Sequence, residues 1–224
     1  MRQMLCGSVI LMSSTLTVSA ELATCDGYDI TVSANNPDVV TAICDAAAQA
    51  QEIFKQCNVP SLSAPLHVDV VEDIRDGCVA MYHCGEGLVE VLSSDLMTQR
   101  RDINGAFSFL TIDRYFHSVI VHEITHAAFD AVHCPIDNCV VGSEYVAYAI
   151  QVMSLTADER QSFVDRAGLD RRVGRDELSA LILYIAPHLF AQKVWTHLSQ
   201  RDDPCGYIGQ ITEGRILLDF EVFE

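Results

Sequence analysis

One stretch of the chain, residues 116–132 (FHSVIVHEITHAAFDAV), limits the possible folds more than any other. It contains no proline or glycine, and most of its side chains are apolar, so it predicts a helix buried on nearly all sides. His122, Glu123 and His126 are the titratable residues at its centre. Two helical residues four apart lie on one face, about 6 Å apart along the axis, so both imidazoles can reach one ion.

This HExxH spacing suits a particular chemistry. His122 and His126 supply two ligands for zinc, and Glu123 lies beside the metal, where it can take a proton from a zinc-activated water. The alternative is a core helix whose histidines bond to neighbours and whose glutamate reaches solvent. Burying three such polar groups without a shared purpose is costly. We therefore favour a metal site with Zn²⁺ as the cofactor.

The motif resembles the HExxH zinc metallopeptidases (zincins), and the resemblance covers residues 66–156. The metzincin branch requires glycine at 129 and histidine at 132, where this chain has Phe129 and Val132. The gluzincin branch takes its third ligand from a second helix downstream. There the resemblance implies Glu144, in a predicted helix (GSEYVAYAIQ) for which Ser143 is the expected N-cap.

Other residues compete for some of these roles. The alternative third ligands are Asp130, His133 and Asp137. The mechanism also needs a donor that stabilises the developing oxyanion. Tyr148 is favoured because it lies one helical turn beyond Glu144, although a packed aromatic residue would show the same spacing; the other candidates are Tyr145, His133 and Arg114. The remaining histidines have no motif around them and are expected to be structural or surface residues: His83, His117, His188 and His197.

The N-terminal twenty residues are typical of a secretory signal peptide. They have an early Arg2, an apolar middle and small residues before a cleavage site near Ala20. A lipoprotein signal ending at Cys25 is disfavoured because Thr24 is large for the position before a lipidated cysteine. No later apolar run is long enough to cross a membrane. We expect a secreted or periplasmic protein.

Cysteine usage agrees with export. One of the nine cysteines lies in the leader, and the remaining eight suggest four disulfides in an oxidising compartment. Two local pairs are expected, Cys134–Cys139 and Cys78–Cys84. Cys44 and Cys57 are not expected to pair, because the helix between them would hold them about 20 Å apart. A second zinc site formed by His133, Cys134 and Cys139 is a weaker alternative.

Composition supports one compact domain. Half of the residues are hydrophobic, which is enough for a substantial core. The formal charge of −17 disfavours binding to nucleic acid or to anionic lipid. A peptide or protein substrate is the expected partner, and the sequence does not indicate the oligomeric state.

Periodicity and capping signals predict an α+β fold. Residues 21–110 form the sheet half, with a mixed sheet of three to four strands and one packed helix, and residues 111–224 form the helical half. The expected strands are 28–34, 66–72, 78–83 and 87–92, with a strand-like tail at 218–222. The expected helices are 37–57, 94–101, the two that carry the metal ligands, 156–168 and 178–198, the last broken at Pro187.

These observations predict a small zincin-like domain that acts as an exported zinc-dependent metallopeptidase. The resemblance implies that the last strand before the metal helix, 87–92, is the sheet edge that binds an extended peptide. The alternative function is a non-catalytic exported domain that binds zinc or a partner on the same scaffold. Glu123 has no part in holding the metal, so its presence favours catalysis.

Overall fold

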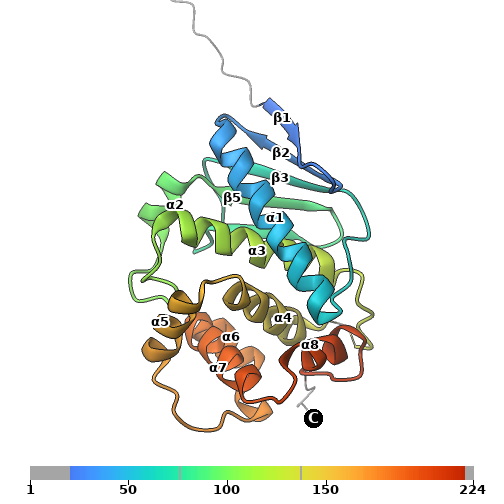
Figure 1. Ribbon diagram of the computed structural model, residues 1–224, viewed down its shortest axis with the longest axis vertical. Helices are drawn as coiled ribbons and strands as arrows, with labels where there is room; N and C mark the ends of the chain where they lie inside the picture. Colours follow the sequence, from blue (N-terminus) through green and yellow to red (C-terminus); the bar gives the residue numbers. More distant parts are fainter. Residues whose placement is uncertain (1–20, 76, 137, 220–224) are drawn as a thin grey trace, which may run out of the picture.

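The computed structural model describes residues 21–75, 77–136 and 138–219, and it shows a mixed α+β fold (Figure 1). A five-stranded mixed sheet is built from the first part of the chain, and helices α3 to α8 follow it. The predicted α+β class is confirmed. The predicted signal peptide, Asp137 and most of the predicted strand-like tail lie outside the described residues, while Leu218 and Asp219 are irregular backbone.

The sheet has the strand order β1-β2-β3-β5-β4. The strands are β1 (Glu21–Thr24), β2 (Ile30–Ala34), β3 (Leu66–Val71), β4 (Ala80–His83) and β5 (Leu88–Leu92). The three central strands are parallel, and both outer strands pair antiparallel. The expectation of three to four strands was too low, because the short β1 carries too little alternation to be recognised and forms only by pairing with β2.

The predicted edge strand is wrong. Residues 88–92 form β5, which pairs with β3 on one side and with β4 on the other, so the strand lies inside the sheet. The edge is β4. A turn with Gly85 and Gly87 at positive φ folds β4 back onto the outside of β5. Gly87 has no room for a side chain, since a Cβ there would lie 2.7 Å from the carbonyl oxygen of Pro65.

Helix α1 (Pro37–Cys57) packs on the sheet and on α3. Asn36 begins it by accepting a hydrogen bond from the N–H of Asp38, and Pro37 fixes the first turn, as the sequence predicts. Alternate side chains of these two strands are buried beneath the helices: Ile30, Val32 and Ala34 in β2, and Leu66 and Val68 in β3. The larger of two apolar clusters in the described residues thus joins the sheet to the helical half.

The other predicted helices are confirmed within a few residues. They are α2 (Ser94–Arg100), α3 (Ile112–Phe129), α4 (Val140–Met153), α5 (Ala157–Ala167), α6 (Ala180–Ile185) and α7 (Pro187–Ser199). The capping box of Thr156 and Glu159 is present, and Pro187 separates α6 from α7. Helix α8 (Pro204–Thr212) and a 3-10 turn at Arg175–Glu177 were not predicted.

The described residues contain three disulfides, and together these indicate an oxidising compartment outside the cytosol. The predicted Cys134–Cys139 disulfide is confirmed. The prediction that Cys44 and Cys57 do not pair with each other is also confirmed, because Cys44 is bonded to Cys25 and Cys57 to Cys205.

The predicted fourth disulfide is wrong, because Cys78 and Cys84 are free. Strand β4 lies between them, and six residues of extended chain span about 20 Å, whereas bonded cysteines have Cα atoms less than about 7 Å apart. The alternative zinc site at His133 is also wrong, since its two cysteines are bonded to each other.

Among the helices of the described residues, none combines the length and the apolar character that a membrane crossing requires.

Candidate metal centre

Helix α3 carries the HExxH residues through the middle of the molecule. Thr111 caps its first turn by accepting from the N–H of Arg114, and its apolar side chains pack on the sheet, α1 and α4. His122 and Glu123 are each only 8% exposed. Such burial is tolerated when polar groups find partners, so their contacts define the site.

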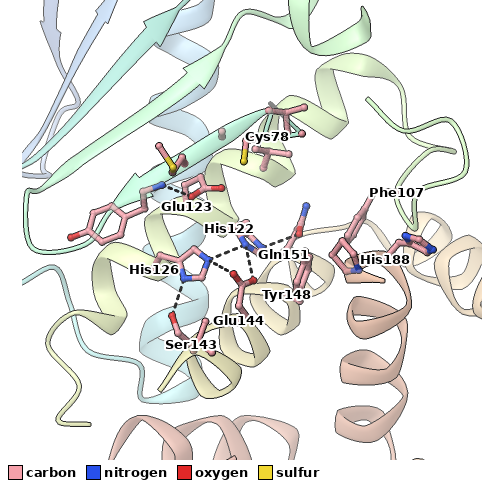
Figure 2. A pocket seen from close by; sticks show the side chains of 18 of the residues that line it. Cys78, Phe107, His122, Glu123, His126, Ser143, Glu144, Tyr148, Gln151 and His188 are labelled. Carbon is pink, nitrogen blue, oxygen red and sulfur yellow. Dashed lines mark hydrogen bonds and ion pairs between the residues drawn. The ribbon is translucent and has the colours of Figure 1, made fainter. Parts of the chain in front are cut away.

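His122, His126 and Glu144 come together from two helices, α3 and α4 (Figure 2). The two Nε2 atoms lie 3.0 Å apart. The carboxylate oxygens of Glu144 lie 3.6 Å from Nε2 of His122 and 3.7 Å from Nε2 of His126. These three side chains therefore form a possible metal-binding cluster.

The cluster fits a zinc ion in size and in donor chemistry. Zinc binds nitrogen and oxygen ligands at about 2.0–2.2 Å in a tetrahedron, which places neighbouring donor atoms about 3.3 Å apart. The observed separations of 3.0, 3.6 and 3.7 Å lie close to that value. Two imidazoles and one carboxylate also leave one tetrahedral position to an outside ligand, as in catalytic zinc sites.

The second nitrogen of each imidazole is also held by α4. Nδ1 of His122 hydrogen-bonds Oε1 of Gln151 at 3.1 Å, and Nδ1 of His126 hydrogen-bonds Oγ of Ser143 at 2.8 Å. Such contacts fix the ring orientation and the tautomer, and leave Nε2 to face a metal. Figure 2 shows Ser143, Glu144 and Gln151 directed from α4 toward the two rings.

Ser143 and Gln151 were missed as site residues, although a signal was present. They and Glu144 are the polar side chains of an otherwise apolar helix, and Gln151 lies two turns beyond Glu144 on the same face. Ser143 was predicted to be the N-cap, which is wrong because α4 begins earlier, at Val140.

Asp219 caps α4 in place of a local residue. The N-cap Cys139 makes no side-chain hydrogen bond, and instead the N–H groups of Val141 and Gly142 donate to the two carboxylate oxygens of Asp219 at 2.7 and 2.9 Å. These N–H groups have no partner within the helix, and an anion there also complements the helix dipole. The end of the described chain therefore fixes the start of the helix that carries Glu144.

Glu123 lies on the side of α3 that faces the sheet edge. Its Oε2 accepts a hydrogen bond of 2.8 Å from the backbone N–H of Tyr82 in β4. Burial raises the pKa of Glu123 to about 7, although the nearby His122 opposes this shift. A carboxylate with a pKa near 7 can both accept and donate a proton at neutral pH.

Electrostatics favour the metal-binding protonation state for His126 and Glu144. Burial lowers the pKa of His126 to about 4, so this imidazole is neutral at pH 7. Burial alone would raise the pKa of Glu144, but the contact with His122 lowers it below its usual value. A neutral imidazole and an ionised carboxylate are the forms that ligate a cation. For His122, burial lowers the pKa, but the contact with Glu144 outweighs burial and raises the pKa above its usual value, so a metal ion has to displace a proton shared by this pair.

A cavity of about 730 Å³ opens onto the cluster and is lined by Glu123, Glu144 and Tyr148. The Tyr148 ring lies 4.6 Å from the His122 ring between centroids, and burial raises its pKa well above the usual value. Its hydroxyl is therefore protonated at neutral pH and able to donate.

The other candidate donors lie away from the cluster. The hydroxyl of Tyr145 is bonded to Nδ1 of His197, and Arg114 forms a bidentate pair with Glu159. His133 is exposed and does not line the cavity.

The remaining alternatives have other partners. Asp130 accepts from the hydroxyl of Tyr82 and the N–H of Gly85, at 2.5 and 2.7 Å, and so is not part of the cluster. His83 pairs with Glu90 and His117 with Gln49, as expected of structural residues. His188 is an exposed surface residue, and it also lines the far part of the cavity beside Phe107 (Figure 2).

Comparison with known proteins places the chain in a family without assigning an activity. The model of a family of unknown function (DUF6639) matches residues 30–221, most of the chain, and the chain belongs to that family. Neither a curated protein nor a solved structure matches this chain.

Proposed function

We propose that this member of a family of unknown function is an exported, zinc-dependent peptidase with a zincin-like fold of the gluzincin type. One observation carries the proposal: His122, His126 and Glu144 converge in a cavity whose wall also holds the buried carboxylate of Glu123. Glu123 is not needed to hold a metal, and its position beside the cluster suits a general base.

His122, His126 and Glu144 would hold the zinc. When bound, zinc supplies Lewis acidity, which polarises a substrate carbonyl and makes water a stronger acid. Glu123 accepts the proton of the attacking water and returns it to the leaving amine, two transfers that a pKa near 7 allows. The Tyr148 hydroxyl is the proposed donor to the oxygen that develops negative charge.

Strand β4 is the proposed binding edge for the peptide backbone. Val79 accepts from the N–H of Leu92, so the backbone groups of residues 79, 81 and 83 face β5, and those of Ala80 and Tyr82 face away from the sheet. The Tyr82 N–H is taken by Glu123. The N–H and C=O of Ala80 remain available to an extended peptide, which would add to the sheet as a further strand.

The Glu123→Gln substitution tests the proposal most directly. We expect the variant to keep one zinc per chain, measured by elemental analysis, and to lose at least about a hundredfold in kcat for any peptide that the wild type cleaves. Glu90→Gln is the matched control, because it removes a carboxylate that pairs with a histidine outside the cluster. A mixed peptide library analysed by mass spectrometry supplies the substrate.

Equal cleavage by the wild type and by Glu123→Gln would show that the peptidase proposal is wrong. Retained zinc without any cleavage by the wild type would favour the alternative, a non-catalytic exported domain that binds zinc or a partner. Binding of a hydroxamate to the zinc-loaded protein, but not to the zinc-free protein, would show that one coordination position is open.

A further inference from the structure

The cavity has a basic end, which is unexpected in a chain of net charge −17. Arg75, Arg100 and Arg101 line it where β4 begins, and among the described lining residues at this end only Asp102 carries a carboxylate. Arg100 is already neutralised, since it pairs with Asp73 at 3.0 Å. The carboxylate of Asp102 accepts from the N–H of Asn104 at 2.8 Å.

Arg101 is held in place but keeps its charge unpaired. Its guanidinium carbon lies 5.1 Å from the centre of the Tyr115 ring, and Nη1 donates to the carbonyl of Leu110 at 3.0 Å. No carboxylate of the described residues lies within ion-pair distance of it. An arginine stacked on an aromatic ring loses little further entropy when it binds a carboxylate.

Tyr115 sets the distance between Arg101 and the metal cluster. It lies on the same face of α3 as Val119 and His122, seven residues before His122, which is about 10.5 Å along a helix. An extended peptide advances about 3.3 Å per residue, so the same distance corresponds to about three residues of a bound strand.

The direction of the peptide follows from the strand that would bind it. Contacts of Tyr82 with Glu123 and of Gly85 with Asp130 show that β4 and α3 run in the same direction. Antiparallel pairing is the more stable arrangement for an added strand. A peptide antiparallel to β4 places its C-terminal part at the Arg101 end of the cavity.

We propose that Arg101 binds a carboxylate of the substrate about three residues to the C-terminal side of the scissile bond. The proposal rests on the proposed peptidase function and defines its substrate class, acidic peptides or short peptides with a free C-terminus. An acidic side chain and a terminal α-carboxylate offer the same two oxygens to the guanidinium, which can bind both.

Four matched peptides test this proposal on the zinc-loaded protein. Three are amidated at the C-terminus and carry Glu, Gln or Lys at the third position after the scissile bond. The fourth ends with Gln at that position and has a free carboxylate. We expect kcat/KM about tenfold higher for the Glu peptide than for the Gln peptide, since a hydrogen bond to a charged group contributes that much. Comparison of the fourth peptide with the amidated Gln peptide shows whether a terminal α-carboxylate raises kcat/KM as much as the Glu side chain does.

Variants of Arg101 connect the preference to this residue. Arg101→Gln should abolish the preference for Glu, and Arg101→Glu should reverse it toward Lys. The matched control is Arg166→Glu, because Arg166 also stacks on an aromatic ring, Phe109, but does not line the cavity. Equal melting temperature and zinc content in all variants exclude a folding defect.

Binding of the same peptides to the Glu123→Gln variant separates the two proposals. If the wild type cleaves no peptide, the peptidase proposal fails, while a tenfold tighter Kd of the Glu123→Gln variant for the Glu peptide that requires Arg101 still supports the carboxylate site. If peptides are cleaved or bound without regard to charge, or if Arg101→Gln keeps the preference for Glu, the assignment of Arg101 is wrong. A preference on the N-terminal side of the scissile bond would overturn the proposed direction.

Discussion

The two imidazoles of the cluster are oriented by neutral partners rather than by carboxylates. Gln151 bonds to His122 and also to the hydroxyl of Ser118, and Ser143 bonds to His126. A neutral acceptor fixes the ring without adding a further negative charge to a site that already contains Glu123 and Glu144. At the scale of single residues, these hydrogen bonds determine how firmly the ligand nitrogens are held.

Removing the partner of His122 should weaken metal binding. Gln151→Ala leaves the ring free to rotate and its Nδ1 without a buried partner, so we expect zinc affinity to fall by about ten- to a hundredfold. Competition with a chelating dye measures this. Gln49→Ala is the control, because Gln49 bonds to His117, away from the cluster. Equal zinc affinity in the two variants would contradict the role of Gln151.

At the scale of elements, α4 organises the site. It carries the third ligand, the partners of both histidines and Tyr148. A shift of this helix along its axis would move all of these groups together relative to α3. The position of its first turn is fixed by Asp219, and so the metal site depends on a residue at the end of the described chain.

Asp219→Ala should therefore lower both stability and zinc affinity. Loss of a helix cap costs about 1–2 kcal/mol, and the freed first turn of α4 should loosen the hold on Glu144. Asp203→Ala is the control, since Asp203 caps α8 through the N–H of Gly206 and has no contact with the cluster. Calorimetry should show similar destabilisation in both variants, with weaker zinc binding only in Asp219→Ala.

At the scale of the whole molecule, disulfides join parts that are distant in sequence. Cys57–Cys205 connects the end of α1 to α8 across 148 residues, whereas Cys134–Cys139 closes a loop of five between α3 and α4. The entropy that a disulfide removes from the unfolded chain grows with loop length, to about 5 kcal/mol for the long loop and about 2 kcal/mol for the short one.

Replacing each pair by alanines should separate these effects. We expect the Cys57/Cys205 variant to melt about 6–12 °C below the Cys134/Cys139 variant, from the difference of about 3 kcal/mol. The short disulfide lies in the loop between the two helices that supply the ligands, so its loss should weaken zinc binding more. Melting temperatures that do not differ, or zinc binding that is weaker in the Cys57/Cys205 variant, would contradict these assignments.

Much of the local structure could be predicted because neighbours in sequence determine it. The spacing of His122 and His126 follows from the helical repeat, and Asn36 and Thr156 each begin a helix through hydrogen bonds that span only two or three residues. Glu144 was chosen through a resemblance in spacing, and the structure brings it beside both histidines.

Contacts between distant segments were decided only by the tertiary structure. Whether β4 or β5 forms the edge depends on which strand pairs with β3, and a strand's own sequence does not encode its neighbours. Cys78 and Cys84 lie close in sequence but are separated by an extended strand, while Asp219 reaches α4 from 77 residues away. The amino-acid sequence by itself determined the ligand-bearing helix, because its apolar pattern repeats every turn. The Asp219 cap of α4, the edge strand β4 and the cysteine pairs were decided only by the tertiary structure, because each joins groups that only folding brings together.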